Sequence, residues 1–224
     1  MTAKLKEKVA VCIRMLERRA LLDMNGHASI RDGDSVLIND SNVSTHGITG
    51  EGILTVALDA TVAPANAPIE LPIHVCIYER YEDINAVIHF HPLYATLCSL
   101  MRTGVPTCSI FGAHLGEVSR LEYPGRIDNN GLGEDLAEKM TGTRACLLRG
   151  HGAVVVGKTL EEAYAAALYL EENSEKWILS AGVADVEPLT NGEVEKVKQN
   201  AWDARIMRRI WNYELSKLCA SDVC

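Results

Sequence analysis

The sequence predicts a mixed α/β domain in which helices cover both faces of one sheet. First, segments with helical spacing alternate with short apolar segments bounded by turn residues. Second, a length of 224 residues fits one hydrophobic core. Third, 47% hydrophobic and 23% charged residues are typical of globular proteins and exclude disordered or collagen-like chains. We expect a single domain over 1–224, with a C-terminal helix and tail at 190–224.

The N-terminal part predicts one helix followed by a small antiparallel ribbon. Apolar residues recur at helical spacing from Lys4 to Met24, and Asn25-Gly26 should end that helix. Short segments between glycine-containing turns then predict strands over 28–31, 35–38 and 53–58.

The middle of the chain predicts a strand between two helices. One helix is expected over about Glu70–Tyr81 and the next over Leu93–Met101. The segment Ile84–His91 mixes apolar and polar residues and is followed by Pro92, which should stop a strand.

The C-terminal half predicts two strands and three helices. The expected elements are a helix over 131–140, strands over 145–148 and 153–156, a helix over 160–181, and a final amphipathic helix from Pro188 to about Lys217. Thr159 should cap the long helix, with Glu161 and Glu162 in the first turn, where the helix dipole favours acidic residues.

Charge and cysteine content exclude several classes of protein. A net charge of -8 without a Lys/Arg cluster argues against a nucleic-acid partner. The cysteines are odd in number and form no C-x-x-C pair, which predicts reduced thiols and a cytoplasmic location. The N-terminus has no signal-like apolar region, and no stretch reaches the ~18–20 apolar residues of a membrane span, so we expect no export and no membrane insertion.

The histidines indicate a metal site. All seven lie between positions 27 and 151. His89 and His91 are two apart on a predicted strand and should project from one face, and His151 lies between Gly150 and Gly152, where the backbone can pass close to a neighbour. Three neutral imidazoles on one divalent ion would leave room for a substrate. Taken alone, the His-x-His pair could also be exposed or a hydrogen-bonded part of the core.

A carboxylate accompanies the histidines. Glu70 and His74 are four residues apart on a predicted helix that leads into the strand with His89 and His91. A carboxylate beside a metal can serve as a displaceable ligand and as a proton carrier. An ordinary solvated glutamate at a helix N-terminus is the alternative.

Several ordered motifs resemble the class II aldolase/adducin family over roughly residues 5–180. The motifs are Asn25-Gly26-His27-Ala28-Ser29-Ile30-Arg31, Glu70-x-x-x-His74, Asn85-Ala86-Val87-Ile88-His89-Phe90-His91 and Leu147 to Gly157. The resemblance implies a three-layer α/β/α sandwich with a mainly antiparallel sheet, and a homotetramer with sites at subunit interfaces. It also implies that His89, His91 and His151 bind the metal and that Glu70 is a base and occasional ligand.

The sequence departs from the sugar-phosphate members of this family. Their phosphate-binding Ser-Gly-Asn turn, Thr-Gly turn and Ser-Ser pair correspond here to Asn25-Gly26-His27, Thr45-His46-Gly47 and Pro68-Ile69. Proline and isoleucine side chains donate no hydrogen bonds. Phosphate would lose contacts worth roughly 1.5–3 kcal/mol each. The tyrosine that family aldolases place about twenty residues beyond the His-x-His pair also has no counterpart.

These departures favour a metal-dependent decarboxylase of a hydroxylated aromatic or heteroaromatic (di)carboxylate. The metal would stabilise the charge left as CO₂ departs, and we expect Glu70 or His114 to protonate the ring carbon. A second carboxylate could bind His27, His46 and Arg149. Three histidine ligands suit zinc or manganese first, with cobalt or iron as further options.

The sequence is also compatible with other functions and roles. The alternative activity is a sugar-phosphate aldolase or epimerase of the fuculose-phosphate aldolase type. An iron-dependent oxygenase and a metal-free, adducin-like binding module are further alternatives. Arg149 could instead be a structural ion-pair partner, His46 a solvated loop residue, and His27 a helix-end cap.

Overall fold

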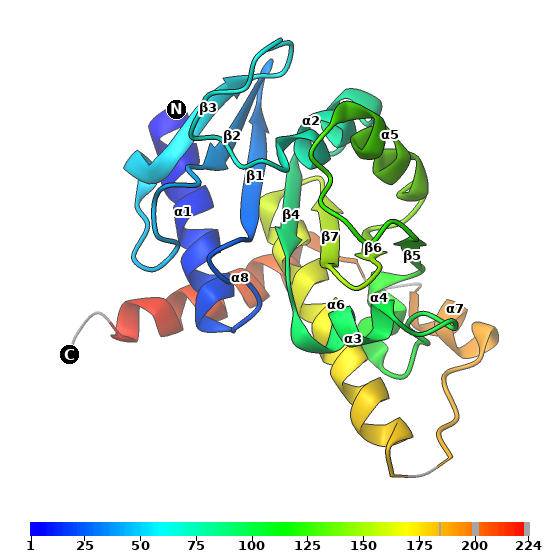
Figure 1. Ribbon diagram of the computed structural model, residues 1–224. Coiled ribbons are helices and arrows are strands. Elements are labelled where there is room, and N and C mark those ends of the chain that lie inside the picture. The colour runs from blue at the N-terminus through cyan, green and yellow to red at the C-terminus, as the bar shows by residue number, and fades with distance from the viewer. Residues whose placement is uncertain (184, 199–201, 222–224) are drawn as a thin grey trace.

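The computed structural model describes residues 1–183, 185–198 and 202–221. It contains one sheet, whose strands are β1 (His27–Asp32), β2 (Ser35–Asn39), β3 (Ile53–Ala57), β4 (Ala86–Phe90), β5 (Val118–Leu121), β6 (Ala145–Leu148) and β7 (Gly152–Gly157). Their order is β3-β2-β1-β4-β7-β6-β5, and all neighbours are antiparallel except β5 and β6. The expected mainly antiparallel sheet is confirmed (Figure 1).

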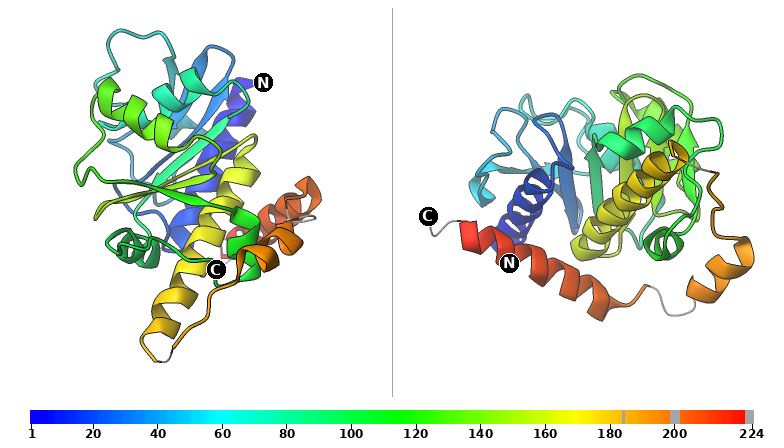
Figure 2. Two further views of the ribbon diagram at one scale, coloured as in Figure 1. Left: turned by 90° about the vertical axis from the view of Figure 1, so that its right-hand side faces the viewer. Right: turned by 90° about the horizontal axis from the view of Figure 1, so that it is seen from below.

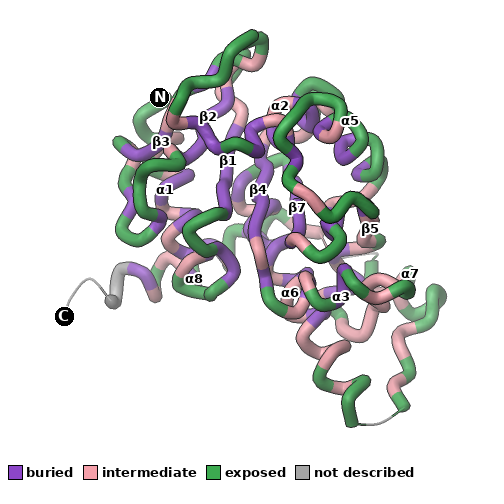
Figure 3. Tube along the Cα trace, viewed as in Figure 1, coloured by how far each residue is buried: buried purple, intermediate pink, exposed green. Residues whose placement is uncertain are grey.

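Helices pack against both faces of the sheet, which confirms the layered α/β fold (Figures 1 and 2). On one face lie α1 (Thr2–Arg18), α3 (Leu93–Ser99), α4 (Ile110–Leu115) and α6 (Leu160–Ala181), and on the other α2 (Leu71–Arg80) and α5 (Asn130–Lys139). The strands between them are largely buried (Figure 3).

Strand β4 shows how the pleat places the site. Ala86 and Ile88 pack into the core under α1 and α6, whereas Val87 packs into the core under α2 and α5. Successive side chains of a strand point to opposite faces, so His89 points to the α2 side with Val87. This alternation brings His89 toward the residues that α2 supplies.

The predicted N-terminal ribbon and the predicted central elements are confirmed, but the first helix ends early. Helix α1 ends at Arg18, because Ala20 adopts a left-handed conformation with φ of 53° and the buried Leu21 and Leu22 turn back into the core. Asn25-Gly26 therefore belongs to a later turn, in which Asp23 Oδ1 accepts hydrogen bonds from both backbone N–H groups. His27 begins β1 and caps no helix.

The C-terminal region differs more from expectation. Thr159 caps α6 as predicted, since its hydroxyl accepts from the Glu162 N–H. The predicted final helix is instead two helices, α7 (Asn191–Lys198) and α8 (Ala204–Ser221), and residues 199–201 lie outside the described part of the chain. Asp203 accepts a hydrogen bond from the Arg205 N–H at the start of α8. The short elements α4, β5 and the 3-10 helix η1 (Gly50–Gly52) were not predicted.

The structure also addresses the expected reduced thiols and the expected lack of a membrane span. Cys12, Cys76, Cys98, Cys108 and Cys146 are free thiols, as predicted, and Cys219 and Cys224 lie outside the residues whose side chains are described. Within the described ranges, no helix combines the length and apolarity that a membrane span requires.

Candidate metal centre

The sheet brings three histidines to one point. His89 lies on β4, His91 follows two residues later, and His151 lies in the turn between β6 and the neighbouring strand β7. One ligand atom from each lies within 4.8 Å of the others. The ring centroids are 4.8 Å apart for His89 and His91, 4.9 Å for His89 and His151, and 5.2 Å for His91 and His151. The predicted trio therefore converges.

Hydrogen bonds fix which nitrogen two of these rings present. His89 Nδ1 lies 3.1 Å from the carbonyl oxygen of Ala153, and His91 Nδ1 lies 3.1 Å from Asp23 Oδ1. Both oxygens only accept, so in each neutral ring Nδ1 carries the proton and Nε2 keeps its lone pair. Such outer hydrogen bonds are typical of metal-binding histidines.

Glu70 faces the same point. It is the residue before α2, and its Oε1 accepts from the Ile127 N–H at 2.8 Å. Its Oε2 lies 3.3 Å from His89 Nε2 and 3.6 Å from His151 Nε2. Burial opposes ionisation, but the interaction with His89 and the Ile127 N–H outweigh it and lower the pKa of Glu70 to about 2. Glu70 is therefore a carboxylate at neutral pH.

The donor set fits a divalent metal ion. His89 Nε2 is buried without a hydrogen-bond partner, although a carboxylate oxygen lies 3.3 Å away. A bare imidazole nitrogen and a carboxylate oxygen repel each other unless a proton or a metal ion lies between them. Nitrogen and carboxylate donors suit zinc, manganese, cobalt and iron, and three histidines leave coordination positions open for a substrate.

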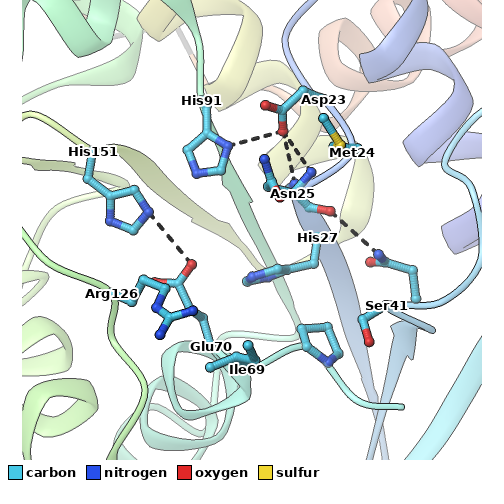
Figure 4. Close-up of a pocket in the computed structure, with 13 residues that line it drawn as sticks. Asp23, Met24, Asn25, His27, Ser41, Ile69, Glu70, His91, Arg126 and His151 are labelled. Atoms are coloured by element: carbon cyan, nitrogen blue, oxygen red, sulfur yellow. Dashed lines mark hydrogen bonds and ion pairs between the residues drawn. The ribbon is translucent and has the colours of Figure 1, made fainter.

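A cavity of about 480 Å³ opens beside these residues (Figure 4). It is lined by Asp23, Met24, Asn25, Gly26, His27, Asn39, Ser41, Pro68, Ile69, Glu70, His91, Arg126 and His151. In the close-up, His91, His151, Glu70 and His27 point toward one another across it. The cavity gives a small molecule access to the candidate metal centre.

The structure brings only some of the predicted residues to this cavity. His27 lines it, whereas His46, Arg149 and His114 do not. The exposed His46 side chain pairs with Glu17 at 3.1 Å. Arg149 is half exposed and 3.9 Å from Glu122, and His114 lies on α4 in contact with the rings of Phe111 and Tyr169. Within one chain, these three are not placed to bind the substrate or protonate it.

Two functional candidates were not found from the sequence. Among the lining residues described, Arg126 alone carries a permanent positive charge, and Asp23 orients His91. Both lie in loops, where no periodicity indicates the direction of a side chain. The only available signal for Asp23 was its place just before the Asn25-Gly26 turn.

Only some of the loop positions that the sequence analysis linked to phosphate binding line the cavity. Pro68 and Ile69 line the cavity, as the resemblance in the sequence implied. Ser41 and Asn39 at the end of β2 line it as well, in place of Thr45-His46-Gly47. The cavity therefore has a hydroxyl group at a place that the sequence did not indicate, and this hydroxyl donates its proton to the Asn66 carbonyl oxygen.

Gly152 packs directly against the histidine pair. A Cβ atom there would lie 2.4 Å from the Phe90 carbonyl oxygen and 2.8 Å from His91 Cδ2, both too close for real contacts. We expect Gly152→Ala to displace His91 and to weaken zinc affinity about 10–100-fold, the range seen when a ligand's orientation is disturbed. Competition with a chelator measures this affinity. Gly192→Ala is the matched control, because nothing lies within 4 Å of its added methyl, and equal affinities would contradict the expectation.

His74 should make stability depend on pH. Burial, with a contribution from His89, lowers its pKa from 6.5 to about 3. Between these values the unfolded chain binds a proton that the folded protein does not. The free energy of unfolding should therefore fall as pH falls below 6.5, by up to about 1.4 kcal/mol per pH unit.

Urea unfolding of the metal-free protein at several pH values checks this. Below pH 6.5, His74→Gln should show a shallower decline than the wild type. His46→Gln, which removes an exposed imidazole, should keep the wild-type slope. Identical slopes for the wild type and His74→Gln would contradict the assignment.

Comparisons with known proteins agree with this geometry. Residues 6–178 match the family described as "Class II Aldolase and Adducin N-terminal domain". An L-fuculose phosphate aldolase of Methanocaldococcus jannaschii is 27% identical over 179 residues, covering 78% of this chain and 96% of that protein. At least four more relatives carry that name.

Two further similarities extend over nearly the whole chain. A 3,4-dihydroxyphthalate decarboxylase of Arthrobacter keyseri is 27% identical over 236 residues, covering 96% of this chain and 94% of that protein. A solved structure of an aldolase II superfamily protein from Pseudomonas syringae aligns with a TM-score of 0.86 at 23% identity, covering 98% of this chain and 93% of that chain. The latter shows that the two proteins share a fold.

Proposed function

The chain belongs to the class II aldolase/adducin family, and from that premise we propose that it is a divalent-metal-dependent carbon–carbon lyase. The observation that carries the proposal is the convergence of His89, His91 and His151 beside the Glu70 carboxylate at the cavity. A binding module of the family would not need this donor set. An adducin is among the relatives, so the donor set, and not family membership, is the support for an enzyme.

The proposed roles follow from the positions of the side chains. A divalent ion held by His89, His91 and His151 would stabilise the negative charge that develops on a substrate oxygen when the adjacent carbon–carbon bond breaks. Glu70, anchored through Oε1, directs Oε2 toward His89 and His151, where it would accept a proton and return it. Arg126 offers a guanidinium group to an anionic part of the substrate.

The relatives favour a sugar-phosphate aldolase. Five of them are named fuculose phosphate aldolases, and these cover most of this chain. Arg126 and Asn25 at the cavity are groups that can bind phosphate oxygens. We therefore place cleavage of a ketose phosphate first among the specific activities.

Two observations support decarboxylation of a hydroxyaryl or heteroaryl carboxylate as the second candidate. Pro68 and Ile69 line the cavity directly before Glu70, and their side chains donate no hydrogen bond to a phosphate. The decarboxylase relative also extends over 96% of this chain. Both activities place an anionic substrate on a metal and leave electrons that must move onto an oxygen.

A parallel assay separates the two candidates. Zinc- and manganese-loaded protein is incubated with fuculose 1-phosphate and, separately, with dihydroxyphthalate, and aldehyde and CO₂ are measured. Aldehyde release alone supports the aldolase, and CO₂ release alone supports the decarboxylase. If the purified protein bound no divalent ion at micromolar concentration, the proposed lyase would be wrong.

We also propose that the protein assembles as a homo-oligomer, with a tetramer expected. Leu93, Leu97 and Leu100 are 62%, 41% and 58% exposed at helical spacing directly after the site-bearing segment. Exposed apolar residues in such a stripe are typical of an interface. Light scattering after size exclusion checks this, and Leu97→Glu should dissociate the assembly.

A further inference from the structure

A buried chain of polar side chains leads from the cavity into the core between β1 and α2. His27 Nδ1 lies 2.7 Å from His74 Nε2, and His74 Nδ1 lies 2.6 Å from Ser29 Oγ. Ser29 Oγ lies 2.7 Å from the Tyr78 hydroxyl oxygen. His74, Ser29 and Tyr78 are fully buried, and His27 is 3% exposed. The proposed metal chemistry uses none of these three contacts.

The local structure explains why these side chains meet. His27 and Ser29 are two apart on β1 and point to the same face of the sheet. His74 and Tyr78 are four apart on α2, hence one helical turn apart on the side that faces β1. A single face of one strand thus meets a single face of one helix.

The proton on the Tyr78 hydroxyl determines which group donates and which accepts in the contacts from Tyr78 through Ser29 to His74. Burial raises the pKa of Tyr78, so its hydroxyl keeps its proton at neutral pH. A buried hydroxyl proton needs an acceptor, and the Ser29 oxygen is the partner of the Tyr78 hydroxyl. Ser29 therefore accepts from Tyr78 and has its own proton for His74. His74 Nδ1 accepts a hydrogen bond from the Ser29 hydroxyl.

The series of hydrogen bonds continues to the cavity with one fixed direction. A neutral imidazole carries one N–H, so His74, which accepts at Nδ1, must donate from Nε2 to His27 Nδ1. His27 in turn carries its proton on Nε2, at the opposite edge of its ring. Because His27 Nδ1 accepts the hydrogen bond from His74, it carries no proton, and the ring is neutral. The ring points into the cavity, toward the side where Glu70 lies (Figure 4).

We propose that Ser29 and His74 hold His27 in the Nε2–H form, so that His27 donates a hydrogen bond to an anionic oxygen of the substrate and does not bind the metal. The substrate part of this proposal rests on the proposed lyase function, whereas the protonation pattern does not. In their neutral forms, His89 and His91 donate from Nδ1 and leave Nε2 without a proton. The cavity thus contains imidazoles of opposite polarity, and Ser29 and His74 are positioning residues.

The protonated nitrogen is measured by long-range proton–nitrogen correlation on metal-free protein with ¹⁵N-labelled histidine. His27 should show its proton on Nε2 in the wild type. Tyr78→Phe should leave this pattern unchanged, because Ser29 can still donate to His74. Ser29→Ala should give a mixture of both forms at His27. A wild-type proton on Nδ1 of His27, or a switch in Tyr78→Phe, would overturn the proposal without affecting the proposed lyase, since this experiment needs neither metal nor activity.

Metal and anion affinities test the two consequences for His27. His27→Asn and His27→Leu should keep zinc affinity within about threefold, well short of the 10–100-fold loss typical of a disturbed metal shell, and His91→Ala serves as the positive control. A loss in both His27 variants like that of His91→Ala would make His27 a ligand and overturn the proposal.

Oxalate is the anion probe for the zinc-loaded protein. His27→Leu should bind oxalate about 10–100-fold more weakly than the wild type, as expected for loss of one hydrogen bond to a charged group. Equal oxalate affinities, or no oxalate binding by the wild type, would overturn the donation step.

Discussion

Replacing His89 with alanine should remove divalent-metal binding and lower turnover by more than about 10³-fold. His89 is fully buried at the centre of the candidate site, 3.3 Å from Glu70 and next to both other histidines. A bound metal contributes several kcal/mol of charge stabilisation, and each 1.36 kcal/mol corresponds to a factor of ten in rate. Metal content by elemental analysis and turnover on the substrate that the parallel assay identifies are the two measurements.

His46→Ala is the matched control for this variant. It also removes one imidazole, but from an exposed side chain that does not line the cavity. It should keep wild-type metal content and activity. If His89→Ala folded and still bound one zinc ion per chain at wild-type affinity, the proposed metal centre would be wrong.

Glu70→Gln should separate metal binding from proton transfer. The amide oxygen of glutamine can still accept from the Ile127 N–H, so the local backbone should stay in place. The variant loses the negative charge and the basic oxygen that faces His89 and His151. We expect zinc to remain bound and turnover to fall about 10²–10⁴-fold, which is the usual contribution of a positioned acid or base.

A glutamate outside the site provides the control for Glu70→Gln. Glu51→Gln changes an exposed residue of η1 and should have no effect on activity or metal content. Wild-type turnover in Glu70→Gln would show that another group moves the proton. Loss of zinc from Glu70→Gln would instead identify Glu70 mainly as a ligand.

The sequence predicted the parts of the site that regular structure positions. His89 and Val87 share one face because strand side chains alternate, and His151 approaches because β7 pairs with β4. Glu70 follows from its place at the start of a helix that was correctly delimited within one residue at each end. In these cases, spacing along the chain determines spacing in the fold.

The sequence could not position side chains in loops or predict where an irregular turn begins. Arg126 and Asp23 reach the cavity from loops, whereas Arg149, in the turn beside His151, points toward Glu122. The end of α1 depends on the left-handed Ala20, a conformation uncommon for alanine. The hydrogen bond between His27 and His74 depends on how α2 packs against β1, which is a tertiary contact that the sequence does not reveal.

Strands and the short turn between them supply the candidate metal-facing histidines, whereas longer loops supply most of the cavity wall, and this arrangement has a consequence for engineering. The candidate metal-facing rings sit on β4, just beyond it, and in the short turn that begins β7, whereas Asp23–Gly26, Ser41, Pro68–Ile69 and Arg126 reach the cavity from separate loops. Loops tolerate exchange better than a packed sheet does. Grafting one such loop from a relative with another preference should therefore change selectivity while the candidate metal centre stays intact, which makes this scaffold a convenient starting point for directed evolution.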